Sequence, residues 1–251
     1  MAMSRTWQNR ENREEQVEYP YFYLPDIGCV AELTPTEAQH AFKVLRLREG
    51  DEIRVTDGKG HLFRAFLGGS SPKEAGLEGV ELIETYSPNR PRLELAIAPT
   101  KQMERIEMVL EKMTEVGLDR FILVNTEHTI RGRVNRARLE KVMVSAMKQS
   151  RKLVATDILL YDSLPEYLRS DLPEGRYIAY CGEDHRKEDL RSQFKSKEDV
   201  AILIGPEGDF TRSEVDTAVA SGFEVVSLGT ERLRTETAAI YAGLVHHILN
   251  H

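Results

Sequence analysis

The chain has 251 residues, of which 41% are hydrophobic and 30% are charged, and its formal net charge is −7. This length allows one large domain or two small ones, each with its own core. The apolar runs are only a few residues long, far short of the roughly 20 residues that span a bilayer, and the start of the chain has no apolar signal region. We therefore expect a cytoplasmic protein without a membrane partner.

Polar residues dominate the first segment, residues 1–18, which has a single tryptophan and little apolar periodicity. Such a composition is typical of a flexible tail. A second break in the pattern is SPNRP at residues 87–91, which indicates a linker. These two segments predict domains at residues 19–88 and 89–251.

The region from residue 19 to 88 is predicted to be rich in strands. In DEIRVTDGKGHLFRAFL, apolar Ile53 and Val55 alternate with polar residues, and Asp57-Gly58 indicates a turn before a second β-prone run. Short strands and turns predict a small barrel. The preceding run TPTEAQHAFKVLRL predicts a helix, and the residues that share its apolar face are Ala38, Phe42 and Leu45.

After residue 91 the pattern alternates between strands and helices. Strands are predicted at residues 93–98, 121–124, 177–181, 201–204 and 224–228. The first helix is expected to be capped by Thr100 and to end at Gly117. Further helices are predicted at residues 136–149, from the capping box Thr211-x-x-Glu214 to Gly222, and over TETAAIYAGLVHHIL at the end. Residues that share the apolar face of the last helix are Ile240, Leu244 and Ile248. This alternation predicts a mostly parallel α/β sheet.

Metal and disulfide chemistry have little support in the sequence. Cys29 and Cys181 lie far apart and form no C-x-x-C pair. The seven histidines have no spacing typical of a metal site. We expect no metal ion and two reduced, structural thiols.

The acidic average conceals a basic segment between residues 128 and 152. It contains a single acidic residue, Glu140, and these basic residues: Arg131, Arg133, Arg136, Arg138, Lys141, Lys148, Arg151 and Lys152. A local basic face on an acidic protein is what RNA binding needs. A solvated helix surface is an equally good explanation of these charges.

Two glycine-containing loops follow predicted strands near the end of the chain. LIGPEGDF begins in the strand at residues 201–204, and LGTERLRTETA (228–238) follows the strand at residues 224–228. In parallel sheets ligands bind beyond the carboxyl ends of strands, where glycine lets the backbone approach. Either loop alone is explained by an ordinary tight turn, but the pair predicts one backbone-lined pocket. Neither a dinucleotide fingerprint nor a P-loop is present.

These two loops resemble the signature of the SPOUT-class RNA methyltransferases, and most of all the 16S ribosomal RNA (uracil-N3)-methyltransferases of the RsmE type. The likeness extends to three further stretches: HAFKVLRLREGDEIRVTDGKG (40–60), EKMTEVGLDRFILVNTEHT (111–129) and AMKQSRK (146–152). The first stretch is similar to the family's PUA-like RNA-binding β-barrel. The resemblance implies a C-terminal trefoil-knotted SPOUT domain, a homodimer and S-adenosylmethionine as the methyl donor.

The resemblance also assigns residues to the site. The residues expected to bind the cofactor are Ile204, Gly205, Glu207, Gly208, Leu228, Gly229, Leu233, Arg234 and Thr237. The loop around residues 181–183 is a candidate third wall. Arg234 is expected to stabilise the negative charge that develops on the uracil ring, with a salt bridge to Glu236 or Glu207 as the alternative. Glu207 and Glu236 are candidate general bases, although either one is equally explained as a helix cap or loop brace.

RNA contact is expected from both predicted domains. The residues assigned to it are Arg46 and Arg48 in the barrel and Arg131, Arg133, Arg136, Arg138, Lys148, Arg151 and Lys152 in the basic segment. The substrate implied by the resemblance is a uridine of 16S ribosomal RNA, either free or within the small ribosomal subunit. Two alternatives remain: a non-catalytic RNA-binding assembly factor, and a methyltransferase of the same class with another RNA acceptor.

Several residues depart from the family's usual pattern. Asp209 stands where many members have a third glycine, and Glu231 puts a negative charge where a cation would face RNA. Leu123 and Thr156 occupy positions that are often proline. These departures lie outside the core LRTETA, which is intact.

Overall fold

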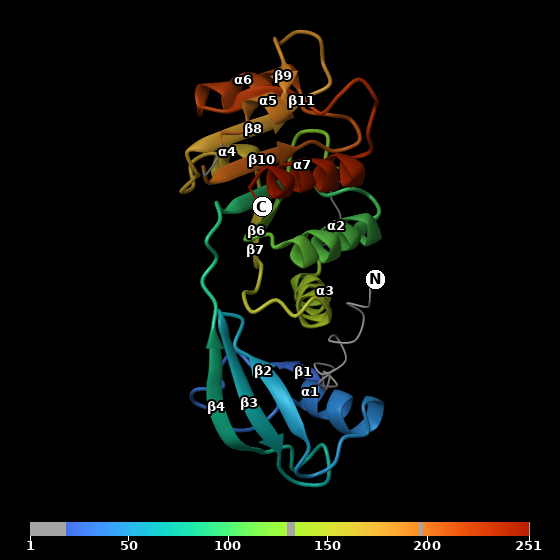
Figure 1. Cartoon of the computed structure of the whole chain (residues 1–251). Coiled ribbons are helices and arrows are strands. Elements are labelled where there is room, and N and C mark those ends of the chain that lie inside the picture. Colours follow the sequence, from blue (N-terminus) through green and yellow to red (C-terminus); the bar gives the residue numbers. More distant parts are fainter. Residues whose placement is uncertain (1–18, 130–133, 196–197, 251) are drawn as a thin grey trace, which may run out of the picture. The chain divides into compact units, whose positions relative to one another are not determined.

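A computed structural model describes residues 19–129, 134–195 and 198–250. The predicted tail at residues 1–18 lies outside the described residues, and so do Arg131 and Arg133. The chain divides into two compact units, and most of their elements are labelled in Figure 1. The first unit extends to Thr56 and includes Leu62–Glu84, and the second comprises Asp57–His61 and the chain from Thr85 onward.

A four-stranded sheet forms the first unit. Its order is β1 (Tyr21–Tyr23), β2 (Glu52–Thr56), β3 (His61–Leu67) and β4 (Leu77–Thr85). Strand β1 is parallel to β2, and β2 is antiparallel to β3. Ile53 and Val55 are completely buried, which confirms the alternation seen in the sequence.

The predicted helix of the first unit consists of α1 (Pro35–Gln39) and a π-helical stretch, η1 (His40–Val44). Thr34 caps α1 by accepting a hydrogen bond from the Glu37 amide at 3.3 Å. Ala38 is buried as expected, but the expected burial of Leu45 is wrong, because this side chain is 39% exposed. The helix ends just before Leu45, and Arg46 then takes a left-handed φ of 57° that turns the chain away.

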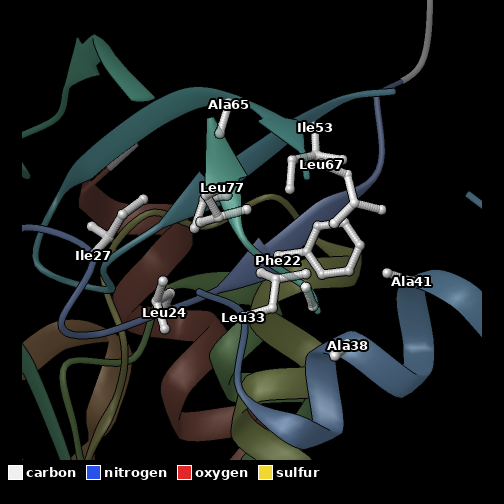
Figure 2. Close-up of a cluster of buried hydrophobic side chains, with 12 residues drawn as sticks. Phe22, Leu24, Ile27, Leu33, Ala38, Ala41, Ile53, Ala65, Leu67 and Leu77 are labelled. Carbon is white, nitrogen blue, oxygen red and sulfur yellow. The ribbon is translucent and has the colours of Figure 1, made fainter. Parts of the chain in front are cut away.

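The core of the first unit lies between its sheet and α1. Figure 2 shows apolar side chains from the strands meeting those of α1 and η1. The labelled members of this cluster are Phe22, Leu24, Ile27, Leu33, Ala38, Ala41, Ile53, Ala65, Leu67 and Leu77. Burial of their apolar surface is the main stabilising contribution to this unit.

Seven parallel strands form the sheet of the second unit, in the order β7-β6-β5-β10-β8-β11-β9. Their bounds are β5 (Leu93–Ile97), β6 (Arg120–Val124), β7 (Asp157–Tyr161), β8 (Gly175–Ala179), β9 (Glu188–Asp189), β10 (Val200–Ile204) and β11 (Glu224–Ser227). All residues of β5 and β10 are buried, as expected for central strands of a parallel sheet covered on both faces. Strand β10 lies between β5 and β8, although β8 precedes it in the sequence.

Helices follow most of these strands. Their bounds are α2 (Met103–Val116), α3 (Arg136–Gln149), α4 (Leu164–Tyr167), α5 (Leu190–Gln193), α6 (Arg212–Ala220) and α7 (Thr235–Asn250). The bounds predicted for α3 and the capping box of α6 are confirmed. The cap predicted for α2 is wrong, because Gln102 precedes the helix and the Thr100 hydroxyl donates instead to the Gln102 carbonyl at 2.9 Å. None of the helices described is both long and apolar enough to cross a membrane.

The last helix, α7, buries a different face from the one predicted. Leu244 is 36% exposed and Ile248 is 71% exposed, whereas the small residues Ala239, Ala242 and Gly243 are buried. A Cβ added at Gly243 would lie only 2.2 Å from the Met113 side chain of α2. Close packing of α7 on α2 therefore selects the small-residue face and leaves the large apolar side chains exposed.

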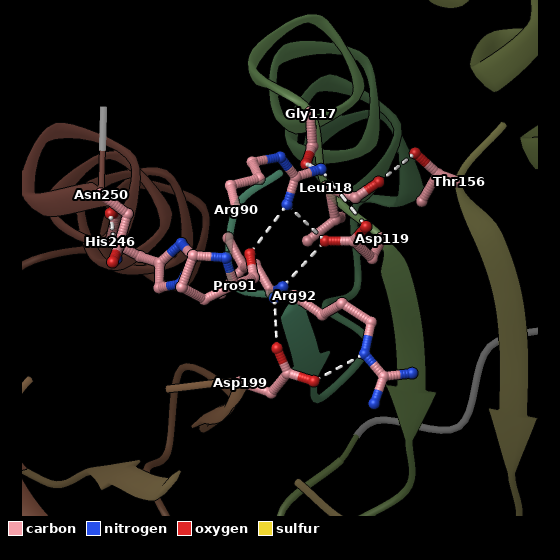
Figure 3. Close-up of polar contacts among 11 residues, drawn as sticks. Arg90, Pro91, Arg92, Gly117, Leu118, Asp119, Thr156, Asp199, His246 and Asn250 are labelled. Atoms are coloured by element: carbon pink, nitrogen blue, oxygen red, sulfur yellow. Dashed lines mark hydrogen bonds and ion pairs between the residues drawn. The ribbon is translucent and has the colours of Figure 1, made fainter. Parts of the chain in front are cut away.

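Polar contacts hold the amino ends of the central strands together (Figure 3). Asp199, just before β10, accepts hydrogen bonds from the Arg92 backbone amide and Nε, both at 2.7 Å. Burial alone raises the pKa of Asp199, but these two bonds outweigh it and hold the pKa below its ordinary value. Asp119 similarly accepts from Arg90 Nη1 at 2.7 Å and from the Leu93 amide at 2.8 Å. The opposite, carboxyl ends of these strands lead into the loops of the site.

Candidate functional site

A cavity of about 740 Å³ opens at the carboxyl ends of β8, β10 and β11. Its walls are residues 179–182 after β8, residues 204–209 after β10, and residues 227–235 between β11 and the start of α7, together with Lys187 and Ala238. The volume lies in the range of sites that enclose small ligands. Its position is the edge at which parallel α/β sheets usually bind them.

Most of the residues predicted to bind the cofactor line this cavity. They are Ile204, Gly205, Glu207, Gly208, Leu228, Gly229, Leu233 and Arg234. Two predicted site residues are absent from its lining. The cofactor candidate Thr237 is exposed on α7, and the candidate general base Glu236 is buried. Helix geometry explains the difference, because Thr235 and Ala238 share the face turned to the cavity while the two residues between them point elsewhere.

The loop after β10 is a compact turn. Its Asp209 amide donates to the Pro206 carbonyl at 3.0 Å, and the buried Gly205 carbonyl accepts from Thr235 Oγ1 at 3.1 Å. A Cβ added at Gly205 would lie 3.1 Å from the Phe210 ring and 3.2 Å from Asp209 Oδ1. A side chain at position 205 would therefore require Phe210 or Asp209 to shift.

Asp209 has a left-handed φ of 61°. This conformation explains why glycine suits the position, and aspartate is among the few other residues that adopt it readily. Its carboxylate also forms two bonds that glycine lacks: Oδ1 accepts from the Phe210 amide at 2.8 Å and Oδ2 from the Cys181 amide at 2.9 Å. Asp209 thus joins the loop after β10 to the loop after β8.

The loop after β8 is the candidate third wall, and Cys181 and Gly182 do line the cavity, whereas Glu183 does not. Lys187 Nζ fixes this loop by donating to the carbonyls of Cys181 at 3.0 Å and Gly182 at 2.7 Å. Burial, with the nearby Asp209 charge, raises the pKa of the Cys181 thiol despite the opposing charge of Lys187. A raised pKa keeps the thiol protonated, which argues against a nucleophilic role.

Arg234 lies in the cavity lining with an exposed side chain. Its guanidinium forms no ion pair with any residue in the part of the chain that the structure describes, so the alternative of a salt bridge to Glu236 or Glu207 is not observed there. Glu236 instead faces Arg105 of α2, with Oε1 3.5 Å from Nη1. Glu207 is exposed and lines the cavity. Arg234 and Glu207 are thus available to a ligand, and Glu236 is a contact between helices.

The basic segment contains ion pairs within the second unit. Arg136 pairs with Glu140 at 2.8 Å, and Arg138 pairs with Glu107 at 2.5 Å. The basic residues near the end of α3 and just after it are exposed or half-buried: Lys148, Arg151 and Lys152. In the first unit, Arg46 and Arg48 are both exposed.

Lys187 and His128 were not predicted as site residues. Lys187 lies six residues beyond Cys181 in a loop without a recognisable motif. His128 lies outside the cavity lining but bonds to its loop after β10. No group of three or more His, Cys, Asp or Glu side chains suited to a metal ion occurs among residues 19–129, 134–195 and 198–250.

Comparison with known proteins agrees with the fold. Residues 87–246 match the RNA methyltransferase domain family, and residues 33–77 match the RNA methyltransferase PUA domain family. A ribosomal RNA small subunit methyltransferase E of Rickettsia conorii is 30% identical over 204 residues, which cover 79% of this chain and 81% of that protein.

Two solved structures extend this likeness. A probable rRNA-methyltransferase from Porphyromonas gingivalis is 40% identical, with a TM-score of 0.83, over 92% of this chain and 98% of that one. A ribosomal RNA small subunit methyltransferase E from Neisseria gonorrhoeae, bound to S-adenosyl methionine, is 27% identical, with a TM-score of 0.78, over the same shares. The parallel sheet, its loop-lined cavity and the PUA domain define an RNA methyltransferase. The chain belongs to the ribosomal RNA small subunit methyltransferase E family.

Proposed function

We propose that the protein transfers a methyl group from S-adenosylmethionine to N3 of a uridine in 16S ribosomal RNA. The observation that carries the proposal is the cavity built by three strand-end loops, with Arg234 in its lining and no carboxylate of the described residues paired to it. The bound S-adenosyl methionine in the relative from Neisseria gonorrhoeae supports the choice of donor.

The residues of the cavity fit this cofactor. Ile204, Leu228 and Leu233 provide apolar surface suited to an adenine ring, and the glycines at 205, 208 and 229 allow close approach to backbone groups. Gly229 has a φ of 122°, and no atom lies within 4 Å of the place where a Cβ would be. The open side of this glycine leaves room for a ligand.

Arg234 is the residue that we assign to the reacting base. When bound, S-adenosylmethionine supplies a methyl group already activated by the positive charge on sulfur. Uridine N3 is weakly nucleophilic until its proton leaves, and the ring then carries negative charge. A guanidinium beside the ring stabilises that charge, and an arginine that is not neutralised by a carboxylate is well suited to the task.

Glu207 is our choice as acceptor of the N3 proton. It lines the cavity, whereas Glu236 is buried against Arg105. Removal of the proton to the Glu207 carboxylate, directly or through water, leaves an electron pair on N3. That pair forms the new nitrogen–carbon bond as the methyl–sulfur bond breaks, and the sulfur leaves neutral.

RNA contact is assigned to basic side chains in each unit. In the second unit the described candidates are Arg136, Arg138, Lys148, Arg151 and Lys152, of which Arg136 and Arg138 face the carboxylates of Glu140 and Glu107. In the first unit, Arg46 and Arg48 are exposed in the unit that contains the PUA match. Contacts to phosphate provide affinity, while base contacts in the cavity provide specificity.

A second copy of the chain is proposed to cover the exposed apolar face of α7. Leu244, Ile248 and Leu249 are 36%, 71% and 48% exposed, and Met108 on the adjacent α2 is 41% exposed. Large apolar side chains exposed on two packed helices are typical of a surface buried by association. The protein is therefore expected to act as a homodimer.

Calorimetric titration with S-adenosylmethionine tests the proposal, with ATP and NAD as control ligands. We expect selective binding of the methyl donor and loss of binding in Gly205→Val, since the branched side chain would press on Phe210 and Asp209 and displace the loop. Thermal unfolding of the variant separates loss of the site from loss of the fold. Failure of the wild-type protein to bind the donor, with and without RNA, would favour the assembly-factor alternative.

A further inference from the structure

Residues 125–129, the segment after β6, contact the loop after β10 from outside the cavity. His128 Nδ1 lies 2.9 Å from the Asp209 carbonyl and 3.1 Å from the Gly208 carbonyl. Carbonyl oxygens only accept hydrogen bonds, so Nδ1 carries the proton and donates to this pair. One imidazole nitrogen thus orients two consecutive peptide groups of the loop.

The imidazole also fills the space beside Gly208. A Cβ added at Gly208 would lie 3.2 Å from His128 Cβ and 3.4 Å from His128 Cγ. The glycine is therefore packed under the histidine on one side while it lines the cavity on the other. His128 therefore holds the loop both by hydrogen bonds from Nδ1 and by packing against Gly208.

A second contact fixes the segment that carries His128. The Glu127 amide donates to Glu214 Oε1 at 2.8 Å, and Glu214 Oε2 accepts from the Thr211 amide at 2.9 Å as part of the α6 capping box. Within the segment, the Thr126 amide donates to Thr129 Oγ1 at 2.9 Å. His128 is therefore presented from a turn that is itself bonded to the start of α6.

The loop after β10 is consequently held from two sides. His128 binds its carbonyls from the β6 side, and the Asp209 carboxylate binds the Cys181 amide on the β8 side. His128 is absent from the cavity lining, so it binds these carbonyls from outside the cavity. These contacts hold Gly208 and Asp209, which line the cavity, in one conformation before the ligand arrives.

We propose that His128 is a positioning residue, which fixes the conformation of the Gly208–Asp209 peptides and thereby sets the affinity for S-adenosylmethionine without touching it. The proposal rests on the proposed function, in which this cavity holds the cofactor. Without the histidine the loop samples other conformations, and the apparent dissociation constant rises in inverse proportion to the fraction of the loop that remains binding-competent. Loss of one hydrogen-bonding group predicts an increase of roughly three- to tenfold.

Three variants of the full chain test this assignment by calorimetric titration with S-adenosylmethionine. His128→Ala removes the donor and should raise the dissociation constant roughly three- to tenfold. His128→Asn retains an N–H donor bonded to Cγ, as in imidazole, and should restore the affinity to within about twofold. His61→Ala is the matched control, because it removes a histidine bonded to a carboxylate, Asp57 at 2.6 Å, and not to a cavity loop.

Two further readouts distinguish positioning from a general structural role. Hydrogen exchange of residues 205–211 in the ligand-free protein should be faster in His128→Ala and normal in His128→Asn, and saturation with donor should reduce the difference. In methyl-transfer assays, KM for the donor should rise in His128→Ala while kcat at saturating donor stays within about twofold. The reason is that the substitution alters the conformation of the loop in the ligand-free protein, and bound donor restores it.

The outcomes separate this proposal from the proposed function. If the wild-type protein binds the donor and His128→Ala binds it equally well, the positioning role is overturned alone. That role is also overturned if His128→Asn is as weak as His128→Ala, since the donor atom then has no effect. If the wild-type protein does not bind the donor at all, the assignment of the cavity is overturned first, and the role of His128 with it.

Discussion

Thr235 Oγ1 donates a hydrogen bond of 3.1 Å to the Gly205 carbonyl, which joins the start of α7 to the loop after β10. Both groups are buried, so loss of the hydroxyl leaves the carbonyl without a partner. Thr235→Val keeps the shape of the side chain and should reduce the free energy of unfolding by about 1–3 kcal/mol. Thr235→Ser keeps the hydroxyl and should lose far less, as measured by denaturant titration. An equal loss in both variants would show that packing of the methyl group matters and the hydrogen bond does not.

Local patterns in the sequence were sufficient to predict most elements of the second unit. Helix α3 was predicted from its apolar spacing, and the cap of α6 from Thr211 and Glu214 three residues apart. These signals involve residues within one or two turns of each other, where helix geometry alone decides the contact. The two glycine loops were predicted to share a pocket because parallel strands end at one edge of the sheet.

Contacts between distant loops could not be predicted in the same way. His128 and Asp209 are 81 residues apart, and no periodicity links their positions. The buried face of α7 was missed for a related reason. Its large apolar residues indicated one face, but Gly243 allows α2 to approach so closely that the small-residue face is buried instead. Apolar periodicity indicates that a face avoids water, and it does not say which neighbour covers that face.

The Asp209 carboxylate should contribute more to cofactor affinity than its backbone conformation does. Asp209→Gly suits the left-handed φ of 61° but loses the bond to the Cys181 amide, while Asp209→Ala loses the bond and adds strain of roughly 1 kcal/mol. We expect both variants to bind S-adenosylmethionine several-fold more weakly in calorimetric titration. Wild-type affinity in Asp209→Gly would mean that the backbone conformation is sufficient and that the side-chain contact is dispensable.

Arg234→Ala should separate turnover from cofactor binding. If the guanidinium stabilises charge on the reacting uracil, its removal should reduce kcat by roughly 10²- to 10³-fold and leave the affinity for S-adenosylmethionine within a few-fold. Arg232→Ala is the matched control for removing a guanidinium from the cavity lining, because Arg232 also lines the cavity and lies near Cys181. Equal losses of turnover and donor affinity in Arg234→Ala would assign Arg234 to the cofactor pocket instead.

Charge reversal at two places in the basic segment tests its role in RNA binding. Arg151→Glu with Lys152→Glu should weaken binding and reduce the slope of log affinity against log salt by about one for each phosphate that the protein no longer neutralises. Arg136→Glu with Arg138→Glu makes the same change in charge but replaces side chains that already face Glu140 and Glu107. Filter-binding titrations at several salt concentrations measure the effect of each pair. If neither pair alters binding at any salt concentration, the segment is a solvated surface.

Sedimentation at micromolar concentration should show a species near twice 28.6 kDa, because the apolar face of α7 is exposed in the single chain. Ile248, 71% exposed, is the most accessible of its large side chains. Ile248→Glu places a charge that would be costly to bury at a dimer interface and should shift the protein toward monomer. Val219→Glu is the control, because Val219 is 44% exposed on α6, a helix outside this face. A wild-type monomer that binds S-adenosylmethionine would contradict the dimer, and dissociation by both variants would show that the α7 face is not specific.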